Sequence, residues 1–417
     1  MNPGDGERQP RTLSYEDGDV VYLPELTYED RVRLSKEKPI CRLRYPDGHY
    51  GWLVTSPTLA RSVYADSRFR MRPLQLAVDD GGLGDALSGP ELAGEPVRND
   101  PPQHTRLRRA LAPHFTPRRV SEYREVIDRT VRERLDAMQD SGSPAEVVTT
   151  FAVPVSSATI GALLGLPMSE RANWEDPSAV LFEPGTGIEM KKAALRQLYS
   201  YLDGVISRKR ESGGPDVLTK LIAAEEFSEV ELTGIAYALV TAGFYTWVEA
   251  LASGVRWLLE DRERWELMKA NAEAIDRAVE ELLRSAPARR GRRSDVRLAR
   301  TATEDIELEG VVVKAGEAVT VAPVLPHGDP SRDPDLEHFD PSRDVVGHLQ
   351  FGHGIHMCLG QHLARLELQI ALQQLMERFP TLYLADDSGA RIDDSTLNGR
   401  RDHLEDPVLA PLLVGWY

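Results

Sequence analysis

The feature that most constrains this chain is a glycine-rich loop that contains one cysteine and leads into an apolar-periodic segment. It reads Phe-Gly-His-Gly-Ile-His-Met-Cys-Leu-Gly over residues 351–360, and apolar residues then recur at helical spacing up to Ile370. Cys358 therefore stands where a tight loop becomes a helix, and backbone N–H groups and the helix dipole favour a thiolate there. Such a thiolate can ligate a haem iron, whereas the alternative for a lone cysteine is a small buried hydrophobic side chain.

This loop resembles the haem-binding signature of the cytochrome P450 family. The chain matches every fixed position of that signature: Phe351, Gly352, Gly354, His356, Cys358 and Gly360. The resemblance implies a mainly α fold with small β-sheets (α+β), in which a triangular helical domain carries a small β-rich lobe. It also implies haem b as the cofactor, with Cys358 as the iron ligand and Phe351 and Gly352 as haem neighbours.

Length and composition fit one large protein domain. The chain has 417 residues, of which 41% are hydrophobic, and it shows no linker or repeat that would divide it. We expect a loose start over residues 1–17 and a single P450 domain over 18–417. A net charge of −16 argues against nucleic acid as a partner. No apolar run approaches the ~18 residues of a membrane span, and no signal-peptide core opens the chain, so we expect no membrane and a cytoplasmic location.

The cysteine count limits the redox equipment of the chain. Cys41 and Cys358 are its two cysteines, which argues against a disulfide framework and fits a reducing cytoplasm. An iron–sulfur cluster needs about four cysteine ligands, and the chain has no Gly-x-Gly-x-x-Gly dinucleotide fingerprint. Electrons must therefore come from peroxide or from a separate protein, and the resemblance implies a ferredoxin with its ferredoxin reductase. Arg106 and Arg109 are candidate docking cations, with solvated charge as the alternative.

Two basic segments are candidates for binding the haem propionates. His104 and Arg108 are four residues apart in a helix that follows Pro101-Pro102, so they share one helix face. They match the His and Arg of the family's C-helix, which hold propionates, although a solvated surface pair is the alternative for such residues alone. Arg300 matches a second propionate-binding segment of the family, and His356 in the cysteine loop is a further candidate.

A capping box at Ser228–Glu231 predicts the start of a helix that runs to about Glu260. The family's I-helix crosses the distal face of the haem and carries the pattern Ala-Gly-x-acid-Thr. The chain has the same Ala, Gly and Thr but a tyrosine at the acid position, over a segment that contains Ala242, Gly243, Phe244, Tyr245, Thr246 and Trp247. The resemblance implies haem contacts at the first two and catalytic roles at Thr246 and Tyr245.

The departure at Tyr245 bears on the reaction. An unperturbed tyrosine has a pKa of about 10 and cannot cycle protons as a carboxylate does. Phe244 and Trp247 add two aromatic rings to the same helix turn and are predicted to line the substrate pocket, with ordinary helix packing as the alternative.

A charged pair is predicted to brace the haem loop. Glu281 and Arg284 are three residues apart and share a helix face. They resemble the family's Glu-x-x-Arg pair, whose third partner is an arginine that corresponds to Arg343. We assign all three a structural role.

The sequence also suggests roles for four further segments. The Gly- and Asp-rich stretch 73–99, the break at 183–185 and the chain end at 407–412 are predicted to lie near substrate, with surface disorder as the alternative for the first. The basic run 287–293 favours a solvated turn, and the alternative is recognition of an anionic substrate group.

These features predict a haem-thiolate oxidoreductase of secondary metabolism that acts on a small aromatic substrate. Because the acid is replaced and aromatic residues cluster, oxidative C–C or C–N coupling, for example of tryptophan-containing cyclic dipeptides, fits this sequence. The alternatives are an ordinary hydroxylase or epoxidase, a haem-binding protein without catalysis, and a protein without haem in which Cys358 is a core thiol.

Overall fold

Two hydrophobic cores organise the chain, a large one among helices and a small one beside a mixed sheet. The computed structural model describes residues 20–22, 33–34, 37–45, 48–71, 93–183, 186–285, 299–321, 338–345, 347–385 and 411–417. Residues 1–17, the basic run 287–293, most of the 73–99 stretch, Pro184 and Gly185, and residues 407–410 lie outside the described residues, so the expectations for them stay predictions.

Helices form most of the described chain. The α-helices are α2 (Pro57–Ala65), α4 (Gln103–Leu111), α5 (Pro117–Val120), α6 (Arg124–Ser141), α7 (Val153–Leu164), α8 (Ala172–Phe182), α9 (Ile188–Ser212), α10 (Val217–Ala223), α11 (Glu229–Leu259), α12 (Arg262–Ala270), α13 (Ile275–Ser285) and α14 (Gln361–Arg378). Short 3₁₀ turns occur at Ala112–Phe115, Ser121–Tyr123, Met168–Glu170, Ala272–Ala274 and Gly354–His356, and a π-helical turn at Val148–Ala152.

Short strands make three sheets. The strands are β1 (Val20–Tyr22), β2 (Ile40–Arg44), β3 (Tyr50–Val54), β4 (Phe69–Arg70), β5 (Ala145–Glu146), β6 (Arg300–Ala302), β7 (Ile306–Leu308), β8 (Val311–Val313), β9 (Ala318–Val321), β10 (Tyr383–Leu384) and β11 (Leu413–Gly415). The largest sheet has the order β1-β2-β3-β9-β6-β4, and the others are β10-β11-β5 and the hairpin β7-β8. In register, β2 pairs antiparallel with β3 at Ile40 and Val54, and β3 pairs parallel with β9 at Trp52 and Val319.

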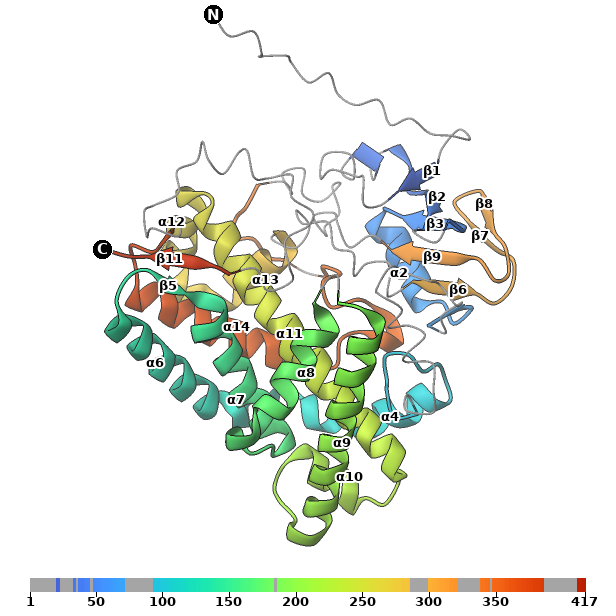
Figure 1. Ribbon diagram of the computed structural model, residues 1–417. Helices are drawn as coiled ribbons and strands as arrows, with labels where there is room; N and C mark the ends of the chain where they lie inside the picture. The colour runs from blue at the N-terminus through green and yellow to red at the C-terminus, as the bar shows by residue number, and fades with distance from the viewer. Residues whose placement is uncertain are drawn as a thin grey trace, which may run out of the picture.

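The arrangement matches the predicted α+β architecture. Figure 1 shows the larger sheet with α2 as a lobe on one side of a helical body. The lobe has its own core, in which Val54, Val63 and Val319 are fully buried. Strand β6 brings Arg300 from this lobe toward the helical body, and the 3₁₀ turn of the cysteine loop packs against α2.

Helix α11 is the central element of the helical body. It has 31 residues, and the predicted capping box is present, with the Ser228 hydroxyl accepting from the Glu231 N–H and the Glu231 side chain accepting from the Ser228 N–H. Figure 1 shows α11 running diagonally through the middle of the molecule, and it packs against α7, α9, α12 and α14.

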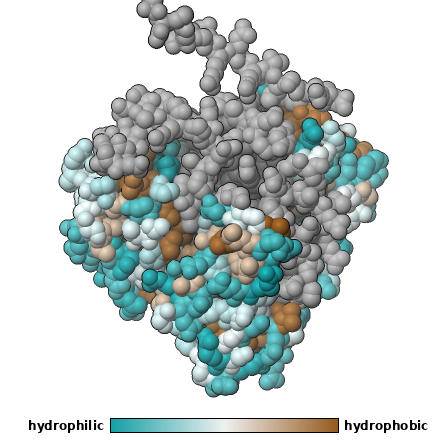
Figure 2. Space-filling model, in the orientation of Figure 1, coloured by the Kyte–Doolittle hydropathy of each residue, from teal (hydrophilic) through white to brown (hydrophobic). Residues whose placement is uncertain are grey.

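By length and composition α11 could cross a membrane, which corrects the expectation that no segment comes close to such a span. Most of its apolar window is buried inside the protein, as in the core helix of a water-soluble protein. The face drawn in Figure 2 is mostly polar where it is coloured, and its apolar patches are small and separate.

Candidate functional site

The loop around Cys358 is closed by a backbone hydrogen bond across it. The Cys358 N–H donates to the Phe351 carbonyl at 2.8 Å, so the cysteine is held beside the first residue of the motif. Helix α14 begins at Gln361, with Gly360 as its N-cap. The structure thus places Cys358 at the predicted transition from loop to helix.

Two glycines in this loop have a conformation that other residues rarely adopt. Gly352 and Gly354 both have a φ of +72°, in the left-handed region. A Cβ atom on Gly354 would also lie 2.4 Å from the Tyr64 carbonyl oxygen of α2. Glycine is therefore required at residue 354 both for the turn and for the close contact between the loop and the β-rich lobe.

The surroundings of Cys358 act on the pKa of its thiol in opposite directions. Burial raises the pKa of the thiol, while the Gly360 N–H and the charges of Arg108 and Arg365 act in the opposite direction. The helix start therefore favours the thiolate, as expected, but burial outweighs its effect on the pKa. A coordinating cation reverses this balance, because a thiol that ligates a metal loses its proton.

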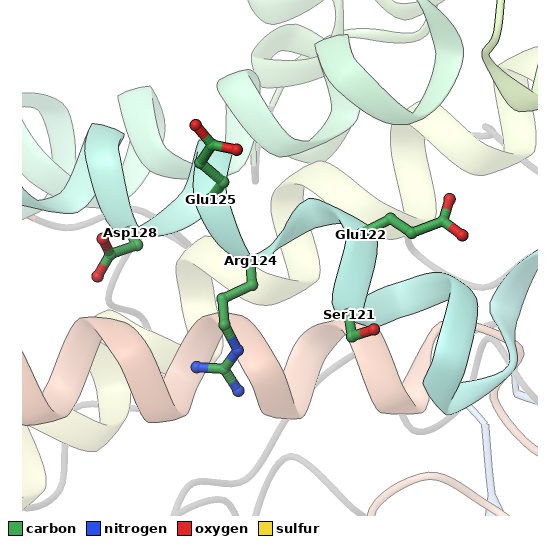
Figure 3. A pocket seen from close by; sticks show the side chains of 5 residues that line it. All are labelled: Ser121, Glu122, Arg124, Glu125 and Asp128. Atoms are coloured by element: carbon green, nitrogen blue, oxygen red, sulfur yellow. The ribbon is translucent and has the colours of Figure 1, made fainter.

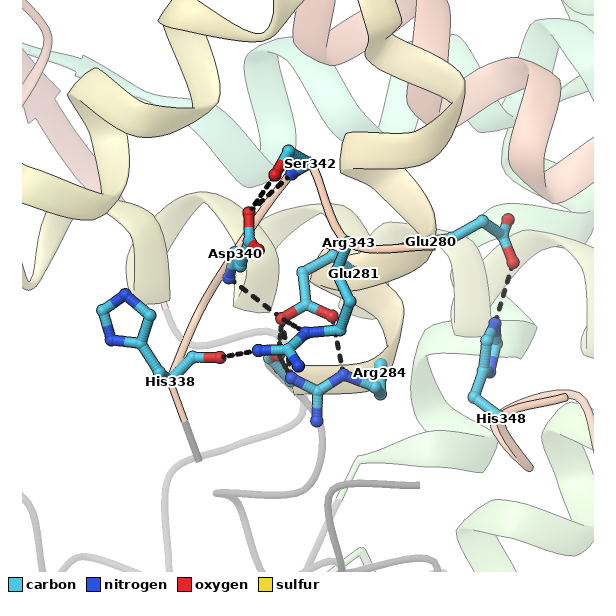
Figure 4. A network of polar contacts seen from close by, with 9 residues as sticks. Glu280, Glu281, Arg284, His338, Asp340, Ser342, Arg343 and His348 are labelled. Carbon is cyan, nitrogen blue, oxygen red and sulfur yellow. Dashed lines mark hydrogen bonds and ion pairs between the residues drawn. The ribbon is translucent and has the colours of Figure 1, made fainter. Parts of the chain in front are cut away.

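The predicted charged brace is assembled behind the loop (Figure 4). Arg284 donates to Glu281 through Nε–Oε2 and Nη2–Oε1 contacts of 2.6 Å each, and both side chains are buried. Arg343 Nε lies 3.5 Å from Glu281 Oε1, and the Asp340 N–H donates to the same oxygen at 3.1 Å. The Glu281 carboxylate thus ties α13 to the segment that precedes the cysteine loop.

A second network, which the sequence did not reveal, joins α13 to α14 and to the loop itself. Arg365 contacts Glu280 at 2.5 Å and 3.0 Å, and His348 Nε2 lies 2.9 Å from the same carboxylate. The Arg365 guanidinium also lies over the Phe351 ring, 4.3 Å from its centroid. Burial disfavours the charge on Glu280, but hydrogen bonds from His348 and Arg365 outweigh it and lower its pKa to about 2.

The four predicted propionate ligands meet on the side of the loop that faces α4 and β6. The His104 and His356 ring centroids are 4.2 Å apart. Burial and then the charge of Arg108 lower the pKa of His104. Burial and then the charges of Arg300, His104 and Arg108 lower the pKa of His356 to about 3. The cluster therefore presents two neutral imidazoles beside two guanidinium cations, near the carboxylate of Asp100.

This cluster fits the propionates of a haem held by Cys358. Arg300 is 5% exposed, and its Nη1 has no hydrogen-bond partner among the described residues. A buried cationic donor in this state needs an acceptor, and a haem carries two carboxylates. Arg108 is close enough to influence both Cys358 and His356 electrostatically, so the cationic cluster adjoins the iron ligand.

Helix α11 turns one face away from its packing neighbours near the middle of its length. Ala242 and Thr246 are exposed, although the helix is otherwise mostly buried there. The Thr246 hydroxyl donates to the Ala242 carbonyl at 2.6 Å, which leaves its oxygen as an acceptor. Both residues therefore face an open side of the helix, and their roles at the haem and in catalysis stay predictions.

Gly243 lies at the edge of this face and serves packing. A Cβ atom there would come 2.5 Å from Ile160 Cδ1 of α7, so the glycine lets two helices approach closely. The structure gives this contact to Gly243, whereas the predicted role was haem binding.

The aromatic residues of this turn lie in the core and do not face the open side. Phe244, Tyr245 and Trp247 are each 2% exposed. The Tyr245 ring stacks on Phe182 of α8 at 4.7 Å and meets Phe244 edge-on at 6.2 Å. Helix packing, the alternative interpretation, accounts for the burial of Phe244 and Trp247, and their assignment to the substrate pocket stays a prediction. Burial, together with Glu183 and Glu249, raises the pKa of Tyr245 far above its usual value.

A hollow elsewhere on the protein surface carries none of these residues. Figure 3 shows it at the start of α6, where the lining side chains are Ser121, Glu122, Arg124, Glu125 and Asp128. It is acidic and open to solvent, and it contains neither the cysteine loop nor the exposed face of α11.

Known proteins share this arrangement across nearly the whole chain. A family model described as Cytochrome P450 matches residues 260–400. Nocardicin C N-oxygenase of Nocardia uniformis subsp. tsuyamanensis is 37% identical over 380 residues, which cover 90% of this chain and 93% of that protein. The chain belongs to the cytochrome P450 family.

Further relatives and solved structures agree with this assignment of the P450. Mycinamicin IV hydroxylase/epoxidase of Micromonospora griseorubida is 34% identical over 357 residues, or 84% of this chain and 87% of that protein. The LnmA cytochrome P450 hydroxylase of Streptomyces atroolivaceus superposes with a TM-score of 0.79 at 30% identity, covering 97% of this chain and 99% of that one. The structure of CYP105P1 with filipin I gives a TM-score of 0.81 at 30% identity, covering 94% and 96%.

Membership confirms the predicted fold class, haem b as the cofactor, monooxygenase chemistry and a place in secondary metabolism. The roles of single residues remain predictions. Sequence reasoning missed Glu280, His348 and Arg365, because α13 and α14 are distant in the chain and such charged residues are common.

Proposed function

We propose that this P450 inserts one oxygen atom from O₂ into a small secondary metabolite, as a hydroxylase, epoxidase or N-oxygenase. The names of its relatives support oxygen insertion, since they include an N-oxygenase and a hydroxylase/epoxidase. The bound haem supplies the oxygen-activating chemistry. The protein supplies the axial sulfur of Cys358, anchors for the propionates, and a shielded site for the substrate.

The exposed face of α11 is the observation that carries this proposal. It offers a small side chain at Ala242 and an alcohol at Thr246, which leave room for substrate and provide a hydrogen-bonding oxygen. A single hydroxyl suits the binding of a water or an oxygen group close to the substrate.

The same geometry weakens the coupling hypothesis. That hypothesis depended on three aromatic side chains in one turn of α11, but all three are buried in the core. They therefore offer no stacking surface to an aromatic substrate. Oxidative coupling becomes an outcome of the test below, and oxygen insertion is the reaction that we propose.

We further propose that a ferredoxin and its reductase deliver the electrons. Cys41 is buried on β2 and cannot build an iron–sulfur cluster alone, so the reductant must come from outside the chain. Arg106 pairs with Glu231 and donates to the Glu226 carbonyl at 2.9 Å, which makes it a poor docking cation. Arg109 is exposed on α4 and is the better candidate.

A cytoplasmic location without membrane or nucleic-acid partners completes the proposal. The net charge of −16 opposes binding to polyanions, and the capping box and tertiary contacts of α11 favour an internal helix.

The test combines ligand screening with isotope labelling. Purified haem-loaded protein is screened against secondary metabolites for a shift of the haem absorption band, and each binder is incubated with ¹⁸O₂, NADPH and a surrogate ferredoxin–reductase pair. One ¹⁸O atom per product molecule is expected by mass spectrometry. A dimeric or cyclised product without label would replace oxygen insertion by coupling.

A further inference from the structure

The less buried residues in the middle of α11 lie on one face of the helix. Between Leu232 and Val255, and apart from Ala252, the residues that are not buried are Leu239, Ala242, Gly243, Thr246, Glu249, Ala250 and Ser253. At 100° per residue, all of them point within about 60° of the direction of Thr246. Glu249 is the ionisable member of this stripe.

Tyr245, at the family's acid position, does not serve this face. Its ring is stacked on Phe182 in the core. Burial raises the pKa of the phenol further above its usual value, and a phenol is a much weaker acid than a carboxyl group. A relay of protons along the open side of α11 therefore needs another group.

We propose that Glu249 takes the place of the missing acid and passes protons toward Thr246. The two residues are separated by three positions, so they are neighbours on one helix face, about 4.5 Å apart along the axis. The Thr246 hydroxyl already donates to the Ala242 carbonyl, so its oxygen accepts a hydrogen bond from a donor on the open side. A protonated Glu249, or a water bound to it, is such a donor.

The role follows from the balance of the reaction and rests on the proposed function. Oxygen insertion into a substrate R–H consumes O₂, two electrons and two protons, and it yields R–OH and water. The electrons come from the donor protein, and Glu249 takes protons from solvent and returns them to the oxygen atom that leaves as water. Glu249 acts through Thr246 or a water and is a positioning residue for these protons.

A buried carboxylate on another helix provides a rival and a control. Glu367 of α14 is 4% exposed, its Oε1 has no hydrogen-bond partner among the described residues, and burial raises its pKa to about 8. Its neighbour is Thr159 of α7, a helix that packs on the side of α11 away from Thr246. Glu367 is therefore not on the open face of α11.

The first experiment tests whether Glu249 lies close to a ligand of the haem iron, and it requires no turnover. Carbon monoxide is bound to the reduced holoprotein, and the infrared C–O stretch is recorded in H₂O and D₂O. We expect Glu249→Gln to shift the band and to remove its solvent-isotope difference. Glu249→Asp should keep part of that difference, and Tyr245→Phe and Glu367→Gln should leave the band in place. An unchanged band in Glu249→Gln, or a shift caused by Glu367→Gln instead, overturns the proposal.

The second experiment separates proton delivery from oxygen insertion. Reduction of O₂ to water by the surrogate ferredoxin pair should slow about tenfold or more in Glu249→Gln, as for loss of a general acid. Oxidation of guaiacol by added hydrogen peroxide, which brings its own protons, should change less than about twofold. Equal losses in both assays would mean a structural defect and contradict the relay. Unlabelled product in the ¹⁸O₂ test would overturn the proposed function alone, because the carbon monoxide spectra do not depend on turnover.

Discussion

The two sides of the cysteine site are stabilised by different interactions. Behind the loop, two carboxylates of α13 are held by charged and polar partners. The buried Glu281 lies between Arg284 and Arg343, and the partly buried Glu280 lies between Arg365 and His348. On α11 the turn around Thr246 is positioned by apolar packing, with Tyr245 stacked on Phe182 and Gly243 against Ile160. Ion pairs therefore position the segment around the Cys358 loop, whereas apolar packing positions the turn of α11 around Thr246. This difference leads us to expect large effects from single charge changes on one side and small effects from conservative changes on the other.

The largest effect is expected at Glu281. Glu281→Ala would remove the carboxylate that both Arg284 and Arg343 contact. Removing one partner of a buried ion pair costs about 3–5 kcal/mol. We expect a fall of this size in the free energy of unfolding, measured with urea, together with loss of bound haem.

The exposed Asp276 at the start of the same helix provides the control. Asp276→Asn should change the unfolding free energy by less than about 1 kcal/mol. Similar losses from the two variants would contradict the view that buried charge holds this side together.

The next largest effect concerns the dependence of stability on pH. The pKa of Glu280 is about 2 in the folded protein, below the ordinary value of 4.5. Its ionised form therefore adds stability that is fully present above about pH 4.5 and is lost as the pH falls toward 2. The shift corresponds to at most about 3 kcal/mol.

Glu280→Gln should therefore be less stable than the wild type at pH 7 by up to about 3 kcal/mol, with the difference shrinking as the pH falls from 5 to 3. Urea unfolding at several pH values measures it. A difference that is independent of pH would show that the carboxylate charge contributes nothing to the network.

The smallest effect is expected at Tyr245. Its hydroxyl is neutral, and the ring makes the packing contacts, so Tyr245→Phe should change stability by less than about 1 kcal/mol. The rate of O₂-driven turnover should likewise change less than about twofold. A large loss of activity with unchanged stability would mean that the phenol takes part in the reaction. It would contradict the expectation that conservative changes in this turn of α11 have small effects.

The features that the sequence predicted well are local ones. The capping box at Ser228, the Glu281–Arg284 pair and the turn of the cysteine loop each depend on residues within a few positions of one another. The orientation of the α11 turn is not local. Successive side chains on a helix point about 100° apart, so Tyr245 and Thr246 face different directions. Only the packing partners on α7 and α8 decide which of the two faces the open side.

Contacts between distant segments were also beyond the sequence. Arg365 and Glu280 are 85 positions apart, and nothing in either segment marks them as partners. The effect of burial on the pKa of Cys358 is likewise a consequence of tertiary packing, which the loop sequence does not reveal.

The account depends most directly on the sulfur of Cys358 as the ligand of the haem iron. The absorption spectrum of the reduced, carbon-monoxide-treated protein tests this, with Cys358→Ala and Cys41→Ala compared with the wild type. We predict the band of a thiolate-ligated haem in the wild type and in Cys41→Ala, and its loss in Cys358→Ala. The same band in Cys358→Ala, or no such band in the haem-loaded wild type, would contradict the account.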